Sequence, residues 1–171
     1  MTGLVFVGHA QGEAVRNAWM RDAREHDARA KALAGLTRPG GHPLTPEQQA
    51  LLADIERQLR NPKLQPATRT CPECAQRFVI VQVGNIAVDY CTRCKGCFFD
   101  PGELMAITHQ PRDIPALNPT HRHSRLRCPV CGEVMWETTF QRNQNLLVDR
   151  CPKGHGIYLQ HGELERALRV A

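Results

Sequence analysis

Seven of the eight cysteines stand at spacings typical of metal ligands. Cys71 and Cys74 form one Cys-x-x-Cys turn, and Cys91 and Cys94 form a second turn beyond an apolar stretch. Each turn directs both sulfur atoms to the same side, so two turns at the ends of a hairpin place four thiolates around one tetrahedral zinc ion. Such a site has no open coordination position, and we expect it to be structural.

The second set of ligands departs from this pattern at one position. Cys128 and Cys131 again form a Cys-x-x-Cys turn, but Cys151 is followed by His155, one place beyond the position of the missing cysteine. Because a histidine side chain is longer than a cysteine side chain, we predict that His155 completes the site, with His161 as the alternative ligand. A site with only three ligands would admit water and permit hydrolysis.

The two ligand sets belong to one unit that occurs twice, from Cys71 to Ile107 and from Cys128 to Leu168. Both copies end in Gly-Glu-Leu, at the same distance from the third ligand. Cys97 is the cysteine left over, and we expect it to be buried in the core of the first copy. The alternative is that Cys97 replaces Cys94 as a zinc ligand.

Each unit is predicted to be a β-hairpin followed by a short helix, which is the pattern of a zinc ribbon. In the first copy β-rich runs at 78–83 and 86–90 flank Gly-Asn, a two-residue hairpin turn. In the second copy the runs at 135–140 and 146–149 flank a longer polar connection. Asp100-Pro101 is predicted to cap the first short helix.

Units of about 40 residues bury too little apolar surface to offset chain entropy unaided. Metal is therefore expected to supply much of their stability, with one zinc ion in each unit and two in the chain. The expected fold class is α+β, made of small metal-stabilised domains.

The segment before the ribbons is predicted to form a helical hairpin. Apolar residues spaced for a helix extend to Leu36, and prolines and glycines interrupt the pattern at 37–43. Thr45-Pro46-Glu47-Gln48 is a capping box that begins a second helix, which ends before Asn61-Pro62. The apolar stripe of this second helix consists of Leu51, Leu52, Ile55 and Leu59. Such a stripe must pack against the ribbons, a second copy of the chain or another protein.

The expected organisation is a helical arm at 1–66, ribbon 1 at 67–109, a proline-rich and then basic linker at 110–127, and ribbon 2 at 128–171. The formal charge is +5 and the pI about 8.9. Zinc ligation lowers this charge because each ligating thiol loses a proton. Global charge therefore favours nucleic acid only weakly. The candidate contacts to nucleic acid are local, namely Arg122, Arg125, Arg127 and Arg142.

The composition favours an intracellular, cytoplasmic protein. No stretch of the sequence approaches the roughly 20 apolar residues of a membrane span, and the mean hydropathy is −0.42. The first forty residues are charged at short intervals and lack the basic start and apolar run typical of a signal peptide, so we expect the cysteines to bind metal and not to form disulfides.

The sequence resembles the transcription factor IIB-type zinc ribbons of small prokaryotic proteins. The resemblance lies in the pattern Cys-Pro-x-Cys, then a hairpin, then Asp-x-Cys-x-x-Cys-x-Gly-x-Phe-Phe-Asp-x-Gly-Glu-Leu. The resemblance covers both repeats and implies zinc binding. Phe98 and Tyr158 stand where that family has Trp, Gln160 stands where it has Asp, and Gly154-His155 replaces its Cys-Gly. Zinc ribbons contact nucleic acids and proteins alike, so the resemblance implies no particular partner.

We therefore predict a non-enzymatic, zinc-binding adaptor that holds a protein partner in a larger assembly, or associates with itself through the helices before the ribbons. The alternative is a nucleic-acid-binding ribbon protein associated with transcription or RNA. A thiol redox enzyme or a zinc hydrolase is less favoured, because the cysteine pairs occur in matched hairpins and not at the start of a helix in a βαβ unit. The sequence shows no phosphate loop, no catalytic triad and no evident site for a small-molecule substrate.

Overall fold

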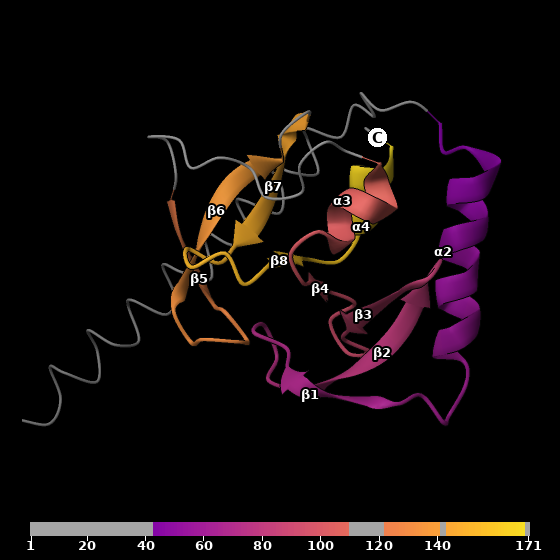
Figure 1. Cartoon of the computed structure of the whole chain (residues 1–171), viewed down its shortest axis with the longest axis horizontal. Coiled ribbons are helices and arrows are strands. Elements are labelled where there is room, and N and C mark those ends of the chain that lie inside the picture. The colour runs from indigo at the N-terminus through magenta and orange to yellow at the C-terminus, as the bar shows by residue number, and fades with distance from the viewer. Residues whose placement is uncertain (1–42, 110–121, 141–142, 170–171) are drawn as a thin grey trace, which may run out of the picture. The chain divides into compact units, whose positions relative to one another are not determined.

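Each copy of the repeat, together with the strand that precedes it, folds into four antiparallel strands and a short helix, and the second copy repeats the element order of the first (Figure 1). The computed structural model describes residues 43–109, 122–140 and 143–169. A longer helix, α2 (Pro46–Leu59), precedes ribbon 1. Ribbon 1 consists of β1 (Pro66–Thr70), β2 (Arg77–Val83), β3 (Ile86–Tyr90), β4 (Cys97–Phe99) and α3 (Glu103–Thr108). Ribbon 2 consists of β5 (Arg122–Arg127), β6 (Val134–Phe140), β7 (Asn143–Arg150), β8 (Ile157–Leu159) and α4 (Glu163–Leu168).

Both predicted hairpins are present. β2 and β3 are joined by Gly84-Asn85, and Gly84 has a φ of 64°, a left-handed conformation that glycine adopts without strain. In ribbon 2, β7 begins at Asn143, three residues earlier than the predicted Leu146. The polar residues of this connection continue the strand because they pair with the end of β6.

A third strand, which we did not predict from the sequence, extends each hairpin. β1 pairs with β2, with Thr70 opposite Arg77, and β5 pairs with β6, with Arg127 opposite Val134. A bulge interrupts the register of both pairs. Residues 122–127, which we expected to lie in the linker, therefore form an edge strand of ribbon 2.

The two ribbons form one continuous sheet with the strand order β1-β2-β3-β4-β8-β7-β6-β5. They meet where β4 pairs antiparallel with β8, and Phe98 lies directly opposite Tyr158. Phe98 and Tyr158 occupy the same position in the two copies of the repeat. The ribbons thus pair through the same strand of each copy, as two subunits do in an isologous dimer.

Alternate residues of β4 and β8 face opposite sides of this sheet. On one side Cys97, Phe99, Ile157 and Leu159 join a core that both ribbons share and that the three helices contribute to. On the other side Phe98 and Tyr158 join a second core that contains Phe78, Met135 and cysteines of both ligand sets. Because both cores cross the ribbon boundary, neither ribbon has a hydrophobic core of its own.

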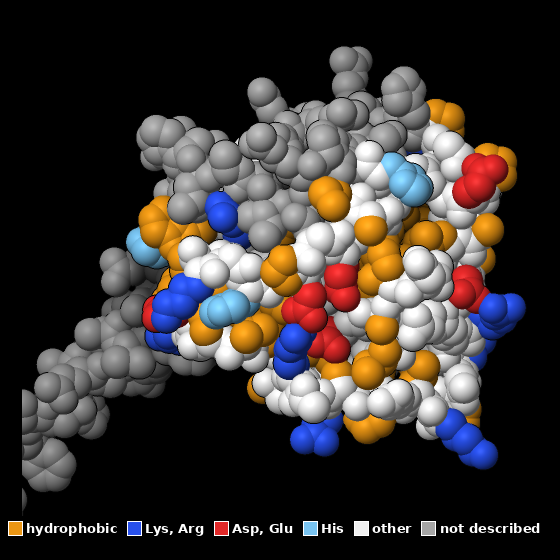
Figure 2. All heavy atoms as spheres, in the orientation of Figure 1, with side chains coloured by type: hydrophobic (Ala, Val, Ile, Leu, Met, Phe, Trp, Pro, Cys, Tyr) orange, Lys and Arg blue, Asp and Glu red, His pale blue; other side chains and the backbone are white. Residues whose placement is uncertain are grey.

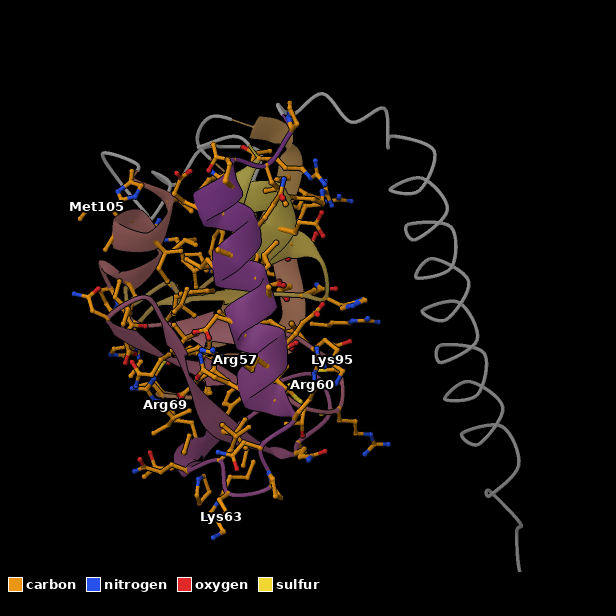
Figure 3. The ribbon with its side chains drawn as sticks, turned by 90° about the vertical axis from the view of Figure 1, so that its right-hand side faces the viewer. Arg57, Arg60, Lys63, Arg69, Lys95 and Met105 are labelled. Carbon is orange, nitrogen blue, oxygen red and sulfur yellow. The ribbon has the colours of Figure 1, made fainter. Side chains whose placement is uncertain are left out.

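Helix α2 begins as predicted, with Thr45 as its N-cap. The Thr45 side chain accepts a hydrogen bond from the Gln48 amide, and the Gln48 side chain accepts one from the Thr45 amide. Its buried residue, Ile55, and its neighbouring leucines pack on the core side of the sheet, against β2. Gln58 fixes the helix further, by exchanging two hydrogen bonds with the backbone of Gln82. Figure 3 views this side of the molecule, with α2 in front of the strands. The apolar stripe of α2 therefore has its partner within the chain.

The short helices begin differently from the prediction. Their N-caps are Gly102 and Gly162, both with left-handed backbone, and neither caps with a side chain. Instead the first glutamate of each helix, Glu103 or Glu163, accepts a hydrogen bond from a backbone amide before the helix. Asp100 does not cap the helix with its side chain, contrary to the prediction. Its carboxylate instead binds Arg69.

The described residues belong to one compact unit of small metal-binding ribbons with strands and short helices. The first helix of the predicted helical hairpin lies outside the described residues. Within the described ranges, no helix is long and apolar enough to cross a membrane.

Candidate metal centres

Site 1 lies at one end of ribbon 1, where the turn between β1 and β2 meets the turn between β3 and β4. The Sγ atoms of Cys71 and Cys94 are 3.3 Å apart, and those of Cys74 and Cys91 are 3.4 Å apart. All four sulfur atoms lie within 4.8 Å of one another, and none is in a disulfide. The structure thus brings the four predicted ligands of site 1 together.

This arrangement fits a zinc ion. Zn–S bonds of about 2.3 Å place two sulfurs of a regular tetrahedron about 3.8 Å apart, close to the separations found here. Cys71 and Cys91 are buried, and Cys74 and Cys94 are half-buried. The four thiolates would fill every coordination position, so the site can hold an ion and offers no position for a substrate.

The same backbone turn presents the first three ligand pairs. In each, the residue four places after the first cysteine has a left-handed backbone: Ala75 (φ 60°), Lys95 (φ 64°) and Gly132 (φ 73°). The amide of that residue donates to the carbonyl oxygen of the first cysteine. The turn therefore closes after the second ligand and holds both sulfurs on one side.

The fourth turn is one residue tighter, which explains the histidine. Here Gly154 has the left-handed backbone (φ 76°), and its amide donates to the carbonyl oxygen of Cys151 only three residues back. The turn thus closes where a cysteine would stand, and the next side chain, His155, takes the ligand position. Its Nδ1 lies 3.5 Å from Cys151 Sγ, as expected when both bind one zinc ion.

Site 2 combines His155 with Cys128, Cys131 and Cys151, and the four ligand atoms lie within 4.8 Å of one another. His161, the alternative ligand, lies elsewhere. It is exposed and lines a pocket beside α2, together with Leu52 and Leu164. The chain therefore carries two zinc sites, one with four cysteines and one with three cysteines and a histidine.

Cys97 is not part of either cluster. Its side chain is 2% exposed and belongs to the core on the helix side of the sheet. Burial raises the pKa of this thiol, so Cys97 stays protonated at neutral pH. It behaves as a small apolar core residue, as we expected from the sequence.

The ligand thiols differ in how readily they lose a proton before a metal binds. Burial raises the pKa of Cys128 to about 12. At Cys131 the hydrogen bond from the backbone of Glu133 prevails, and the pKa falls to about 7. Zinc binds the thiolate form, so Cys131 is better prepared than Cys128 to make the first bond.

Tyr158 of ribbon 2 reaches site 1 of ribbon 1. Its hydroxyl oxygen lies 3.3 Å from the Sγ atoms of both Cys71 and Cys94, and it donates to a carboxylate oxygen of Glu73 at 3.1 Å. Burial, reinforced by these neighbouring sulfurs, raises the pKa of Tyr158, so the hydroxyl keeps its proton. The sequence analysis placed Tyr158 in a ribbon core and missed this contact, because only the pairing of β4 with β8 creates it.

Glycines make room for the aromatic rings at the ribbon contact. A Cβ atom on Gly96 would lie 2.0 Å from the Tyr158 hydroxyl oxygen. The aligned residue, Gly156, has Phe98 in the equivalent place, with a ring carbon 2.7 Å from the position of a Cβ. Each ribbon thus inserts its aromatic residue into the ligand turn of the other ribbon.

The side chains that bind the buried aspartate of each ribbon differ between the two ribbons. In ribbon 1, Arg69 binds both Asp89 and Asp100, and its guanidinium lies over the Phe98 ring at 5.4 Å. In ribbon 2 the aligned residues are Leu126, Asp149 and Gln160. The Gln160 side chain donates to Asp149 at 3.1 Å. Glutamine therefore replaces aspartate where the arginine is missing.

The candidate nucleic-acid contacts lie on β5 rather than in a linker. Arg122, Arg125 and Arg127 are all exposed there, and the His123 ring packs on Trp136, with ring centroids 4.7 Å apart. Figure 2 shows Lys, Arg and His side chains over this part of the sheet, with an acidic side chain beside them. On the rest of this face, too, basic and acidic side chains are interspersed. The fourth candidate, Arg142, lies outside the described residues.

One family model matches the sequence. It is described as transcription factor zinc-finger, and it matches residues 70–109 and again residues 127–170. The two matched segments contain the two ligand clusters and their strands. No curated protein and no solved structure gives a significant match to the chain.

Proposed function

Because residues 70–109 and 127–170 are two tandem zinc ribbons of the transcription factor zinc-finger family, we propose that the chain is a non-enzymatic adaptor that holds a protein partner in a larger assembly. Both zinc sites support a structural role for the metal. Each provides four protein ligands, which leaves no position for the water or substrate of a catalytic zinc ion. Zinc ribbons as a group serve as binding modules, so function must be sought on their surface.

The observation that carries this proposal is the single eight-stranded sheet with two outer edges. Within the described residues, β1 and β5 pair on one side only. An edge strand offers backbone amides and carbonyls to another chain, and strand addition is a common way to bind an extended peptide. Both ribbons and α2 share one core, so the two edges are held by a rigid support.

Capture of partners by edge-strand variants tests this proposal. Thr68 and Arg125 are exposed residues at aligned positions of β1 and β5. Proline at either position removes one backbone amide from an edge strand, within the bulge that both strands share, so Thr68→Pro and Arg125→Pro are matched controls for each other. The zinc-loaded full chain and both variants would be immobilised in a nuclease-treated lysate, and bound proteins quantified by mass spectrometry.

We expect a stoichiometric protein that one variant loses and the other retains. Zinc content measured on each variant shows that the fold is intact. If both variants retained the partner protein equally, the partner would bind a surface other than the two edge strands. A wild-type chain that stays monomeric and retains no stoichiometric protein would overturn the adaptor proposal.

The second candidate function is nucleic-acid binding, and the arrangement of β5 favours it. This strand carries three exposed arginines and no acidic residue. Arg122 lies 4.0 Å from Glu137 and Arg127 donates to the carbonyl oxygen of Gly132. The Arg125 side chain has no hydrogen bond or ion pair to a side chain or backbone group of the described residues. A row of arginines beside an aromatic residue is suited to phosphates and bases.

Fluorescence anisotropy with labelled duplex and single-stranded DNA and RNA, titrated across salt, tests the second candidate. Binding through β5 predicts a steep salt dependence and its loss when Arg122, Arg125 and Arg127 are replaced together by alanine. The control replaces three exposed cations of the α2 side, which Figure 3 labels, and removes the same charge: Arg60, Lys63 and Lys95. Equal weakening by both triple variants would indicate charge attraction alone, and no binding at low salt would exclude this function.

A further inference from the structure

Site 1 receives a hydrogen-bonding group from the other ribbon. Tyr158 is fully buried on β8, and its ring lies against Gly96, in the turn that carries Cys94. The hydroxyl oxygen is 3.3 Å from the sulfurs of Cys71 and Cys94, one ligand from each turn of site 1. One hydroxyl therefore bridges the two turns that must stay together for four-coordinate binding.

When zinc is bound, the tyrosine hydroxyl must be the donor of the hydrogen bond and the cysteine sulfur the acceptor. A thiolate bound to zinc has no proton and accepts hydrogen bonds, whereas the tyrosine hydroxyl has one proton to donate. Groups that donate to metal ligands fix their orientation and tune the metal site. Glu73, whose carboxylate lies 3.1 Å from the same hydroxyl, competes for that proton.

Within the described residues, no side chain of ribbon 1 reaches a ligand of site 2 in the same way. The residue aligned with Tyr158 is Phe98, which pairs with it across the β4–β8 contact. Phe98 packs its ring against Gly156, in the turn of site 2, just as Tyr158 packs against Gly96. The Phe98 ring carries no hydroxyl, so the two sites have the same steric support and unequal hydrogen bonding.

We propose that Tyr158 is a positioning residue for the zinc ion of site 1, which holds Cys71 and Cys94 in place from the neighbouring ribbon. Retention of zinc at site 1 then depends on the contact between β4 and β8. Site 2 does not depend on a reciprocal hydroxyl, because Phe98 cannot supply one. The dependence runs in one direction, from ribbon 2 to the metal of ribbon 1.

Tyr158→Phe in the full zinc-loaded chain tests the proposal, because it removes the hydroxyl and keeps the ring. Transfer of zinc to a chromogenic chelator would be followed in time, and the two sites resolved as two phases. We expect roughly 10-fold faster release from site 1 and unchanged release from site 2. Tyr90→Phe is the matched control, since Tyr90 is the other tyrosine of the chain, and it should leave both phases unchanged.

Cobalt substitution identifies the site and the cause. The four-cysteine site and the site with one histidine give different ligand-field bands, so each phase can be assigned. Loss of a hydrogen bond to a thiolate raises the energy of the sulfur orbitals, and the sulfur-to-cobalt charge-transfer band of site 1 should move to longer wavelength in Tyr158→Phe. A change in packing alone would not produce this shift.

Glu73→Ala separates the two acceptors of the Tyr158 proton. If the hydroxyl acts on the thiolates, removal of Glu73 leaves zinc retention at site 1 unchanged or improved. Faster release in Glu73→Ala, equal to that in Tyr158→Phe, would mean that the hydroxyl acts through the carboxylate and would overturn the proposal. Equal acceleration at both sites in Tyr158→Phe would overturn it as well, because it would indicate general loss of the ribbon contact.

Discussion

Phe98 lies directly opposite Tyr158 across the contact between β4 and β8. These two residues occupy the same position in the two repeats, so the strand contact is nearly symmetrical about a point between them. An isologous contact of this kind requires each ribbon to present a surface complementary to itself. Differences between the ribbons close to this point, such as the Tyr158 hydroxyl that Phe98 lacks, therefore break the symmetry of the contact.

The two glycines at the ribbon contact are expected to be indispensable for packing. Gly156→Ala would place a Cβ 2.1 Å from the carbonyl oxygen of Phe99, and backbone cannot move aside as a side chain can. Gly96→Ala would press on the buried Tyr158 hydroxyl. We expect each to lower the free energy of unfolding by about 1–3 kcal/mol or more, and Gly156→Ala to have the larger effect.

Thermal unfolding of the zinc-loaded variants measures this effect. Gly132→Ala is the control for backbone strain, because Gly132 also has a positive φ of 73° but has open space at the Cβ position. It should cost about 1–2 kcal/mol. If Gly156→Ala destabilised the protein no more than Gly132→Ala, close approach of the two ribbons would not be the reason for the glycine.

His155 is expected to be required for zinc at site 2. Its Nδ1 lies close to Cys151 Sγ, whereas His161 is exposed in a different part of ribbon 2. His155→Ala should therefore reduce the zinc content from two ions to one per chain, and His161→Ala should retain both. Elemental analysis after exhaustive dialysis checks this. Loss of one zinc ion in His161→Ala, with both retained in His155→Ala, would show that His161 and not His155 is the fourth ligand.

The ligand pairs and hairpins could be predicted because they rest on local patterns. The spacing of Cys71 and Cys74 defines a turn, and the alternation of apolar residues around Gly84-Asn85 defines a hairpin. The shift from cysteine to His155 was also visible. Its cause, a turn that closes one residue earlier at Gly154, depends on backbone geometry that a single sequence does not display.

The joining of the ribbons could not be predicted in the same way. Cys97-Phe98-Phe99 and Ile157-Tyr158-Leu159 read as short apolar runs, which suit any buried segment. That each run is a strand, and that the two strands pair with each other, depends on contacts between residues about 60 positions apart. The edge strand β5 was missed for a related reason, since an arginine-rich segment has the composition of a linker and becomes a strand only by pairing with β6.

The Arg69 cluster gives a prediction about compensation between the repeats. Arg69→Leu copies the residue found in ribbon 2 and leaves the half-buried Asp89 beside Asp100 without a cation. Burial already raises the pKa of Asp89, which shows that its charged form is disfavoured there. We expect a loss of about 1–3 kcal/mol in the free energy of unfolding.

Adding Asp100→Gln to Arg69→Leu should recover part of this loss. The new glutamine can donate to Asp89, as Gln160 donates to Asp149 in ribbon 2. A double-mutant cycle measured by chemical denaturation gives the coupling energy of the pair. Strictly additive effects would indicate that the arginine and the aspartate act independently, and that the pattern in ribbon 2 is not a compensation.

Loss of one zinc site is expected to weaken the other ribbon. The core on the zinc side of the sheet contains Cys71 and Phe78 from ribbon 1 and Met135 and Tyr158 from ribbon 2. If site 1 is abolished by Cys71→Ser with Cys74→Ser, β4 loses its anchor and no longer supports β8. We therefore expect faster hydrogen exchange in β6 and β7, measured by mass spectrometry, although their own ligands are intact.

Cys97→Ser controls for the loss of a buried cysteine that binds no metal, and it should keep both zinc ions. It removes an apolar contact from the opposite core and so reports the effect of packing alone. Unchanged exchange in β6 and β7 after loss of site 1 would mean that ribbon 2 folds independently. The shared sheet would then be an association of two self-sufficient ribbons.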